Sequence, residues 1–277
     1  MEAARGNAVF GWRLRLPSVV LQVRVRNRSQ VDAVEESLRS ALDGLKVDLS
    51  FRSVGSPGWV GISVSGEDEN VAVRYLEENV GLCPSSVEDV HRFSVLKGYV
   101  VNLLGCRDGL KIDVGVSSPE HVDFLIPLHV LQAQLADGRK VALAKLVELF
   151  GLCEGLPLEV RVSDLDSSSG FYKAQLAEMQ VERFAFWTRS LLDRLLVVGA
   201  SREEAEEAVE FSGLFRDIVE VDSLGFLEHA LVCKLGTDAK GLISRVGRVL
   251  RKAGLTVFSA RRVVDFLGEE AVSSVLW

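Results

Sequence analysis

The stretch that decides the fold of this chain is FSVLKGYVVNLLGCRDGLKIDVGVSSPEHVDFLIP, residues 93–127, which is continued by LPLEVRVSDLD, residues 156–166. Short runs of valine, leucine and isoleucine alternate here with turn residues, which predicts a series of short β-strands. Glycines stand between or inside the expected strands, where a strand bends or another backbone comes close: Gly98, Gly109 and Gly115. We therefore expect residues 93–164 to form a closed or nearly closed β-barrel.

In its order of strands and glycines this stretch resembles an S1-like OB barrel, a fold used mostly for single-stranded RNA or DNA. The resemblance implies aromatic residues on which bases stack, and the two in suitable places are Tyr99 and Phe124. Leu110 and Ile126 stand where such barrels usually carry aromatics, and only four of the five strands are visible. A barrel that acts as a scaffold or a protein-docking module therefore remains an alternative.

The first 90 residues alternate between strand and helix patterns. Apolar residues recur every second position in the strands and every three to four positions in the helices. The expected elements are strands at Val19–Asn27, Val47–Val54 and Trp59–Val64, and helices from a cap at Ser29 to Leu45 and over Glu67–Val80. The order β-α-β-β-α predicts an α/β sandwich with both helices on one face of a small sheet.

The last third of the chain predicts a second small domain. Ser201 and Glu204 have the spacing of a capping box at the start of a helix that runs to about Phe211. Strands are expected at Leu195–Val198, Asp217–Val221, Leu227–Leu235 and Leu255–Val263, with a helix over Ala239–Ala253. The order β-α-β-β-α-β is that of a ferredoxin-like fold.

The predicted fold class is therefore α+β, in three small domains. Residues 1–90 form the sandwich, 91–166 the barrel with a helical insertion, 167–193 a connecting helix, and 194–277 the ferredoxin-like domain.

Composition limits the classes of partner. The chain has 277 residues and a net charge of −7, so any attraction to nucleic acid must come from a local patch. Neither a membrane-spanning run nor a signal peptide is visible, which predicts a cytoplasmic protein. The four cysteines are widely spaced, as expected of buried thiols rather than a disulfide framework.

Several segments, in the same order along nearly the whole chain, resemble an archaeal family designated domain of unknown function 2110. They are Asp113–Val116, Leu149–Leu152, Leu156–Leu158, Arg216–Val221, Leu224–Glu228, Val232–Cys233 and Gly241–Ile243. The resemblance implies an archaeal, cytoplasmic protein with an informational role, and it supplies no catalytic residues.

Signals of catalysis are weak in this sequence. The four histidines form no HxH or HExxH pattern, so their spacing predicts no metal site. Asp164 and Asp166 lie in DLDSSSG, where turn formation is the simpler explanation. No P-loop, nucleophile elbow or dinucleotide-binding glycine pattern is present. We therefore expect a protein without catalytic activity, metal or cofactor.

A first basic surface is expected on the open face of the N-terminal sheet. The alternation of strand residues places five arginines and one tryptophan away from the helices: Arg13, Arg15, Arg24, Arg26, Arg52 and Trp59. Guanidinium groups bind phosphate and stack on bases, so such a face suits RNA. A solvated face, or a face packed against the neighbouring domain, is the alternative.

A second basic surface is expected on the last helix and strand of the chain. Its residues are Arg245, Arg248 and Lys252, followed by Arg261 and Arg262. Five glutamates on the other helix of the same domain offer a competing explanation, because ion pairs between the two helices would use these charges internally.

These patterns together favour a non-catalytic protein that binds RNA or another single-stranded nucleic acid. A protein-interaction adaptor using the same surfaces is the first alternative, and a ferredoxin-like sensor of a small ligand is the second. The patterns do not predict an oligomeric state.

Overall fold

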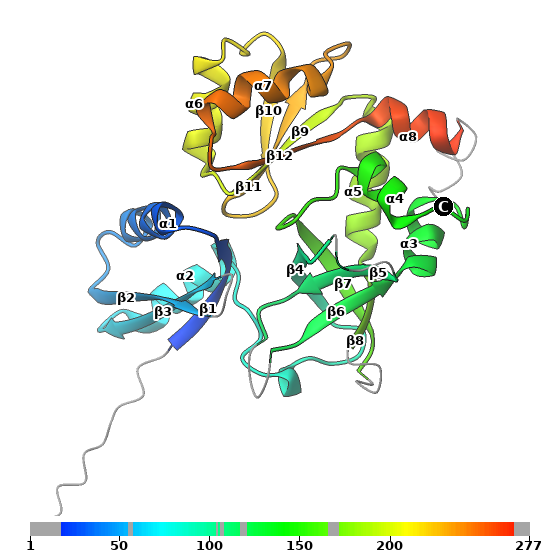
Figure 1. Cartoon of the computed structure of the whole chain (residues 1–277). Helices are drawn as coiled ribbons and strands as arrows, with labels where there is room; N and C mark the ends of the chain where they lie inside the picture. Colours follow the sequence, from blue (N-terminus) through cyan, green and yellow to red (C-terminus); the bar gives the residue numbers. More distant parts are fainter. Residues whose placement is uncertain are drawn as a thin grey trace, which may run out of the picture.

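The computed structural model describes residues 18–54, 58–103, 105, 108–116, 121–165 and 172–268. It is an α+β structure in which an N-terminal unit, a barrel and a C-terminal sheet meet at a common centre (Figure 1). Within the described ranges, no helix is both long and apolar enough to span a membrane. Arg13 and Arg15 lie outside the described residues.

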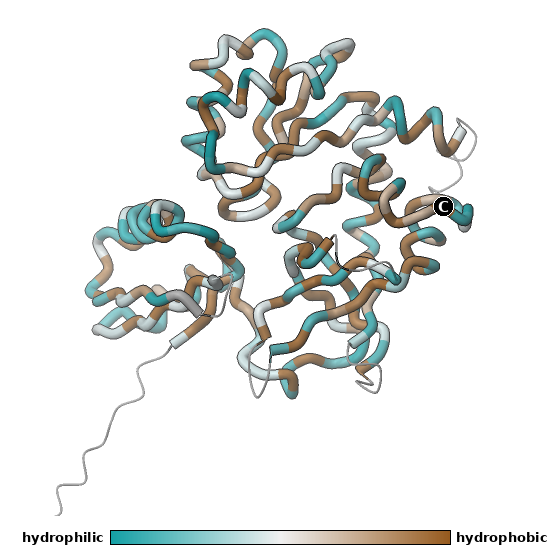
Figure 2. The backbone as a smooth tube through the Cα atoms, in the orientation of Figure 1, coloured by the Kyte–Doolittle hydropathy of each residue, from teal (hydrophilic) through white to brown (hydrophobic). Residues whose placement is uncertain are grey.

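The N-terminal unit has the predicted order of elements. They are β1 (Ser18–Val25), α1 (Arg28–Ala41), β2 (Val47–Val54), β3 (Gly58–Gly66) and α2 (Glu69–Asn79). The three strands form an antiparallel sheet in the order β1-β3-β2. Each helix buries an apolar stripe against this sheet, while α1 is hydrophilic on its outer side (Figure 2). The cap of α1 is Asn27 rather than the predicted Ser29, because the Asn27 side chain accepts the amide hydrogen of Gln30.

The barrel is closed, as predicted. After a 3-10 turn (Val87–Asp89), its elements are β4 (Val95–Val101), β5 (Gly109–Asp113), β6 (Asp123–Pro127), α3 (Leu128–Leu135), α4 (Leu143–Phe150), β7 (Pro157–Asp164) and β8 (Tyr172–Leu176). The strands follow the order β4-β5-β6-β8-β7, with β7 returning to β4. Five strands closed in this way agree with an OB-like fold.

The fifth strand corrects the predicted boundary of the barrel. β8 pairs with β6 and β7, yet it lies beyond residue 166, in a segment that was expected to be helical from Phe171 onward. Helix α5 (Glu178–Ser190) begins only after β8 ends. The strand is five residues long and runs almost directly into the helix, so its period-two pattern is too short to stand out.

Gly98 shows why the barrel needs glycine inside a strand. A Cβ atom at this position would lie 2.4 Å from Cγ2 of Ile112 and 2.8 Å from Cγ1 of Val114. The barrel wall therefore leaves no room for a side chain at Gly98.

The C-terminal unit has the predicted ferredoxin-like topology. Its elements are β9 (Arg194–Val198), α6 (Arg202–Phe211), β10 (Ile218–Ser223), β11 (Glu228–Cys233), α7 (Ala239–Val249), β12 (Gly254–Phe258) and α8 (Ala260–Leu267). The antiparallel sheet has the order β10-β11-β9-β12. The predicted last strand is too long: it ends at Phe258, and Arg261 and Arg262 lie on α8.

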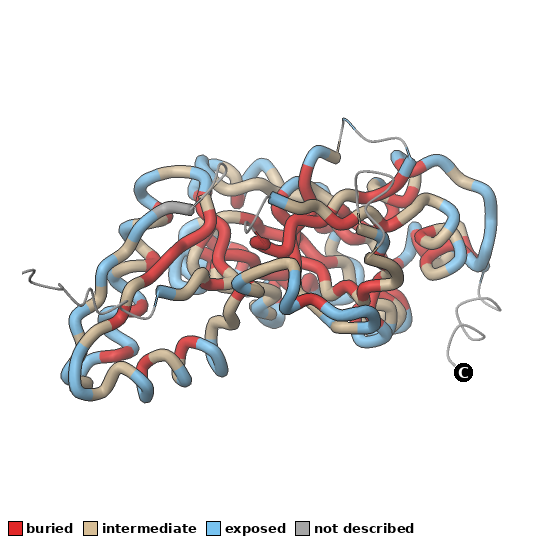
Figure 3. Tube along the Cα trace, turned by 90° about the horizontal axis from the view of Figure 1, so that it is seen from below, coloured by how far each residue is buried: buried red, intermediate tan, exposed pale blue. Residues whose placement is uncertain are grey.

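Buried residues, drawn in red in Figure 3, run through the centre of the molecule where the three units meet. The barrel and one face of the C-terminal sheet share a single apolar core. Within that core, rings from α4, α5 and β12 pack edge to face or stacked, including Phe150, Phe184 and Phe258. The N-terminal unit has a core of its own, into which Leu227 of the C-terminal unit is inserted.

Candidate functional site

The open face of the N-terminal sheet is covered by the barrel at the end where Trp59 lies. The Trp59 side chain is only 4% exposed, and its Nε1–H donates to Oδ2 of Asp113 at 3.0 Å. Its ring packs edge to face on Tyr99, with 5.3 Å between the ring centroids. The Tyr99 hydroxyl in turn donates to the carbonyl of Gln22 at 2.8 Å. The prediction that Trp59 is exposed was therefore wrong. Strand alternation correctly placed its side chain on the face of the sheet away from the helices, but the barrel covers that face.

Arg24 is part of the same covered contact. It is 8% exposed, and its guanidinium lies 3.5 Å from Oδ2 of Asp113. Burial lowers the pKa of Arg24, while the nearby Asp113 carboxylate raises it. Arg24 is thus engaged inside the protein and is not available to a phosphate group.

Gly115 allows this contact to close. Its φ of +81° belongs to the left-handed region, and a Cβ atom there would lie 2.4 Å from Sγ of Cys83. In this conformation its amide hydrogen binds Oδ1 of Asp113 at 2.9 Å.

The aromatic residues predicted to stack on bases are all buried. Phe124 points into the barrel core at 1% exposure, and Tyr99 is completely covered by the contact with the N-terminal sheet. The expectation that Trp59, Tyr99 and Phe124 offer stacking surfaces is corrected, because each of these rings already packs inside the protein.

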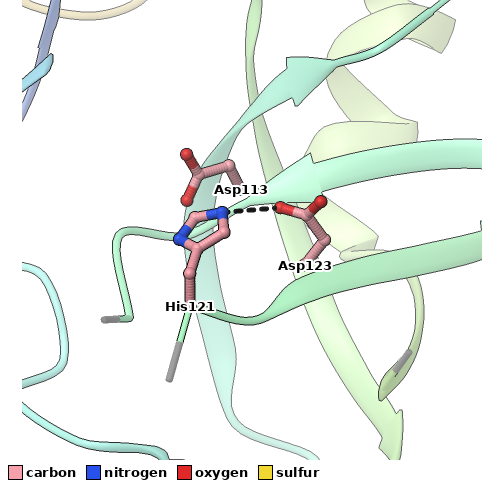
Figure 4. Close-up of side chains that lie close together, drawn as sticks. All are labelled: Asp113, His121 and Asp123. Atoms are coloured by element: carbon pink, nitrogen blue, oxygen red, sulfur yellow. Dashed lines mark hydrogen bonds and ion pairs between the residues drawn. The ribbon is translucent and has the colours of Figure 1, made fainter. Parts of the chain in front are cut away.

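Asp113, His121 and Asp123 form a cluster that the sequence patterns did not predict (Figure 4). Asp113 and Asp123 are direct partners in the register of β5 and β6, and His121 lies just before β6. One ligand atom from each residue falls within 4.8 Å of the others, and Nε2 of His121 lies 3.2 Å from Oδ1 of Asp123. The three side chains come together because of the register in which β5 pairs with β6, and the spacing of residues along the chain does not reveal that register.

The cluster already contains its own positive charge. Asp113 accepts hydrogen bonds from the Gly115 amide and the Trp59 indole, and it also pairs with Arg24. Burial raises the pKa of Asp123, whereas His121 lowers it. Asp113 therefore links the N-terminal unit to the barrel, whereas Asp123 pairs with His121 within the barrel.

A buried acid lies where all three units meet. Glu228 is 2% exposed, and its Oε2 lies 3.5 Å from the Tyr99 hydroxyl. Burial raises the pKa of Glu228 to about 8, although the positive charge of Lys97 acts in the opposite direction. Burial has the opposite effect on a base, and it lowers the pKa of Lys97. The sequence patterns did not predict the burial of Glu228 and Lys97. The visible signal was the glutamate that begins the otherwise apolar strand EHALVC.

A group of basic residues gathers where the N-terminal and C-terminal units touch. We call Arg26, Arg28, Arg248, Arg251 and Lys252 the basic seam; all five are exposed. Nζ of Lys252 lies 3.2 Å from the Ser29 hydroxyl. Arg26 donates to the carbonyl of Glu154 and lies 3.7 Å from where a Cβ of Gly254 would be. Of the predicted residues, Lys252 thus reaches the start of α1 and Arg26 lies beside Gly254, while Arg248 is exposed in the last turn of α7.

The other predicted basic residues lie apart from the seam or are engaged elsewhere. Arg52 is exposed beside the Ser18 hydroxyl. Arg245 binds the carbonyls of Ser212 and Gly213 at the end of α6 and faces Asp217 at 4.0 Å. Among the described residues, the expected ion pairs between α7 and the glutamates of α6 are not formed. On α8, Arg261 is exposed and Arg262 pairs with Glu148.

The chain was also compared with known protein families. Two models match it: the DUF2110 central domain over residues 91–188 and the DUF2110 C-terminal domain over residues 192–258, together more than half of the chain. The chain belongs to the DUF2110 family. The DUF2110 central domain spans the whole barrel, including β8, and most of α5. The DUF2110 C-terminal domain ends with β12, before α8. Comparison with curated proteins gave no match.

Proposed function

We propose that this protein binds RNA or another single-stranded nucleic acid, without catalysis, and that the basic seam contacts the phosphate backbone. The observation that carries the proposal is the contact of Lys252 with Ser29. It brings the segment after α7 against the start of α1, so that exposed cations of the C-terminal unit and of the N-terminal unit flank one contact. Extended basic surfaces of this kind follow a nucleic-acid strand.

The local charge favours a polyanion although the whole chain is negative. Asp32 and Glu154, two acids that contact seam residues or their neighbours, are already engaged. Asp32 pairs with Arg28 at 2.9 Å, and the carboxylate of Glu154 accepts the backbone amides of Asn102 and Leu103. Arg248, Arg251 and Lys252 are exposed, and no ion pair is formed by any of the three within the described part of the chain. Phosphate contacts at such cations release counterions.

The barrel supports this surface rather than supplying it. OB-type domains bind oligonucleotides mainly on their second and third strands, which here are β5 and β6. Trp59 and Arg24 of the N-terminal unit already occupy the Asp113 end of that face. In the proposal the barrel is thus the scaffold that fixes the two halves of the basic seam.

Binding of a labelled single-stranded RNA, measured by fluorescence anisotropy over a salt series, tests the proposal. Replacing Arg248 and Arg251 together by glutamine should weaken binding. It should also reduce the slope of log K against log salt by about 1.4, since each single-strand phosphate contact contributes about 0.7. The matched control is Arg74→Gln, a replacement of an exposed arginine of α2 that pairs loosely with Glu78, at 3.9 Å. Equal slopes for both variants and the parent would refute the role of the seam.

The same measurement separates the alternatives. A protein-interaction adaptor would retain its partners at high salt and bind RNA no better than the double variant. A small-ligand sensor would bind no RNA at any salt concentration. The proposal also includes the cytoplasmic location and the archaeal informational role that the family resemblance implies.

A further inference from the structure

A cleft of about 370 Å³ lies beside the start of α6, where the N-terminal unit, the barrel and the C-terminal unit meet. Its walls come from all three units: Ser37 and Asn79 from the N-terminal helices, Lys97 from β4 of the barrel, and Arg202 and Ser223 from the C-terminal domain. A volume of this size suits a small metabolite.

Lys97 is a charged residue of the cleft whose ammonium group has no direct partner among the described residues. Among the described residues, its ammonium group makes no hydrogen bond and no ion pair within 4.0 Å. The charged groups that act on it are more distant, namely Glu228, Glu159 and Arg183. The side chain is half-buried, and its ammonium nitrogen still reaches solvent, so its three donors are open to a ligand from the cleft.

Arg202, which forms an ion pair with Glu206, is a second cation in the lining of the cleft. Its Nε donates to Glu206 and its Nη1 to the Ser223 hydroxyl, so that Nη2 makes no hydrogen bond to another described residue. The backbone amides at the start of α6 are already capped by Ser201 and Glu204 and add nothing to this argument. The recognition groups of the cleft are therefore side chains.

We propose that the cleft binds a small molecule through a phosphate group held between Lys97 and Arg202. The donors still available are the Lys97 ammonium, Nη2 of Arg202, the Ser37 hydroxyl and one amide hydrogen of Asn79, whose other contact is the Tyr75 carbonyl. Donors on several sides of the cleft match the three peripheral oxygens of a phosphate better than the two of a carboxylate. One acid, Glu203, also lines the cleft, and Ser201 together with the Glu203 backbone amide holds its carboxylate.

Such a ligand would join three domains at once. Because every wall belongs to a different unit, its binding energy adds to the stability of their docked arrangement. The site shares no residue with the basic seam, and the inference does not depend on RNA binding.

Thermal unfolding of the full chain with inorganic phosphate or pyrophosphate, against NaCl at equal ionic strength, tests the inference. The parent protein should show a saturable rise in Tm with phosphate that NaCl does not produce. Lys97→Gln and Arg202→Gln should each weaken the apparent affinity at least about tenfold, because each loses a charge-assisted hydrogen bond. Arg202 is exposed, so its variant keeps the test valid if Lys97→Gln fails to fold.

The controls distinguish this site from general anion binding. Arg74→Gln and the double replacement of Arg248 and Arg251 should retain the full response to phosphate. No saturable rise in the parent protein, or an unchanged affinity in both cleft variants, would overturn the inference.

Discussion

Replacing Glu228 by glutamine should make the protein more stable at high pH and leave it unchanged at low pH. The two side chains have nearly the same shape, and the glutamine carbonyl still accepts the Leu227 amide hydrogen that the carboxylate accepts. What the substitution removes is a group that has to bury a negative charge when it ionises.

The size of the effect follows from the two pKa values. In the folded protein Glu228 keeps its proton up to about pH 8, whereas in the unfolded chain it loses the proton near its ordinary value of 4.5. Between these values unfolding releases a proton, so the contribution of Glu228 to stability falls as the pH rises and becomes constant above about 8. At about 1.4 kcal/mol for each pH unit, the total loss is at most about 5 kcal/mol.

Urea unfolding of the parent and Glu228→Gln from pH 5 to pH 9 measures this directly. The difference in unfolding free energy should be below about 1 kcal/mol at pH 5 and grow to several kcal/mol at pH 9, in favour of the variant. Glu77→Gln, an exposed change on α2, should give no such trend. A difference that does not depend on pH, or one that favours the parent at high pH, would refute the reasoning.

Three further predictions concern the packed interior. Trp59→Ala should lower the free energy of unfolding by about 3–5 kcal/mol, because it removes the ring that packs on Tyr99 and the hydrogen-bond donor to Asp113. Chemical unfolding measures this loss. A change below about 1 kcal/mol would contradict the burial of the ring. Gly98→Ala should prevent the barrel from closing, because the added methyl group would collide with Ile112. Loss of cooperative unfolding and of soluble protein would report this. A normal melting curve would contradict the tight packing at Gly98. Alkylation by iodoacetamide at pH 8, followed by mass spectrometry, should be far slower in the folded protein than in urea for three cysteines, because burial raises the pKa of each thiol: Cys83, Cys153 and Cys233.

Local patterns predicted the elements of the two sandwich-like units well. The capping box of Ser201 and Glu204 is formed as the sequence suggested, and the β-α-β-β-α-β order produces the expected sheet. These features depend on residues close together in the chain, where side-chain periodicity and capping determine the outcome. The closed barrel was also predictable, since Gly98 stands where two strands come closest.

Features that depend on distant residues were not predictable. Alternation placed Trp59 on the face away from the helices, but it carries no information about the domain that covers this face. The pairing of Lys252 with Ser29 joins positions more than two hundred residues apart. The sequence patterns did not predict the short elements β8 and α8, because five to eight residues contain too few repeats of a strand or helix pattern.

The insertion of Leu227 into the N-terminal core has a consequence for biosynthesis. Leu227 is 1% exposed among the side chains of β1, β3 and the two N-terminal helices, although it belongs to the last domain of the chain. Chains fold as they leave the ribosome, N-terminal parts first. The N-terminal unit therefore emerges with a gap in its interior that only a much later segment fills. A ribosome that stalls after the barrel would release a chain whose first domain has an open apolar surface, a substrate for chaperones rather than a finished module.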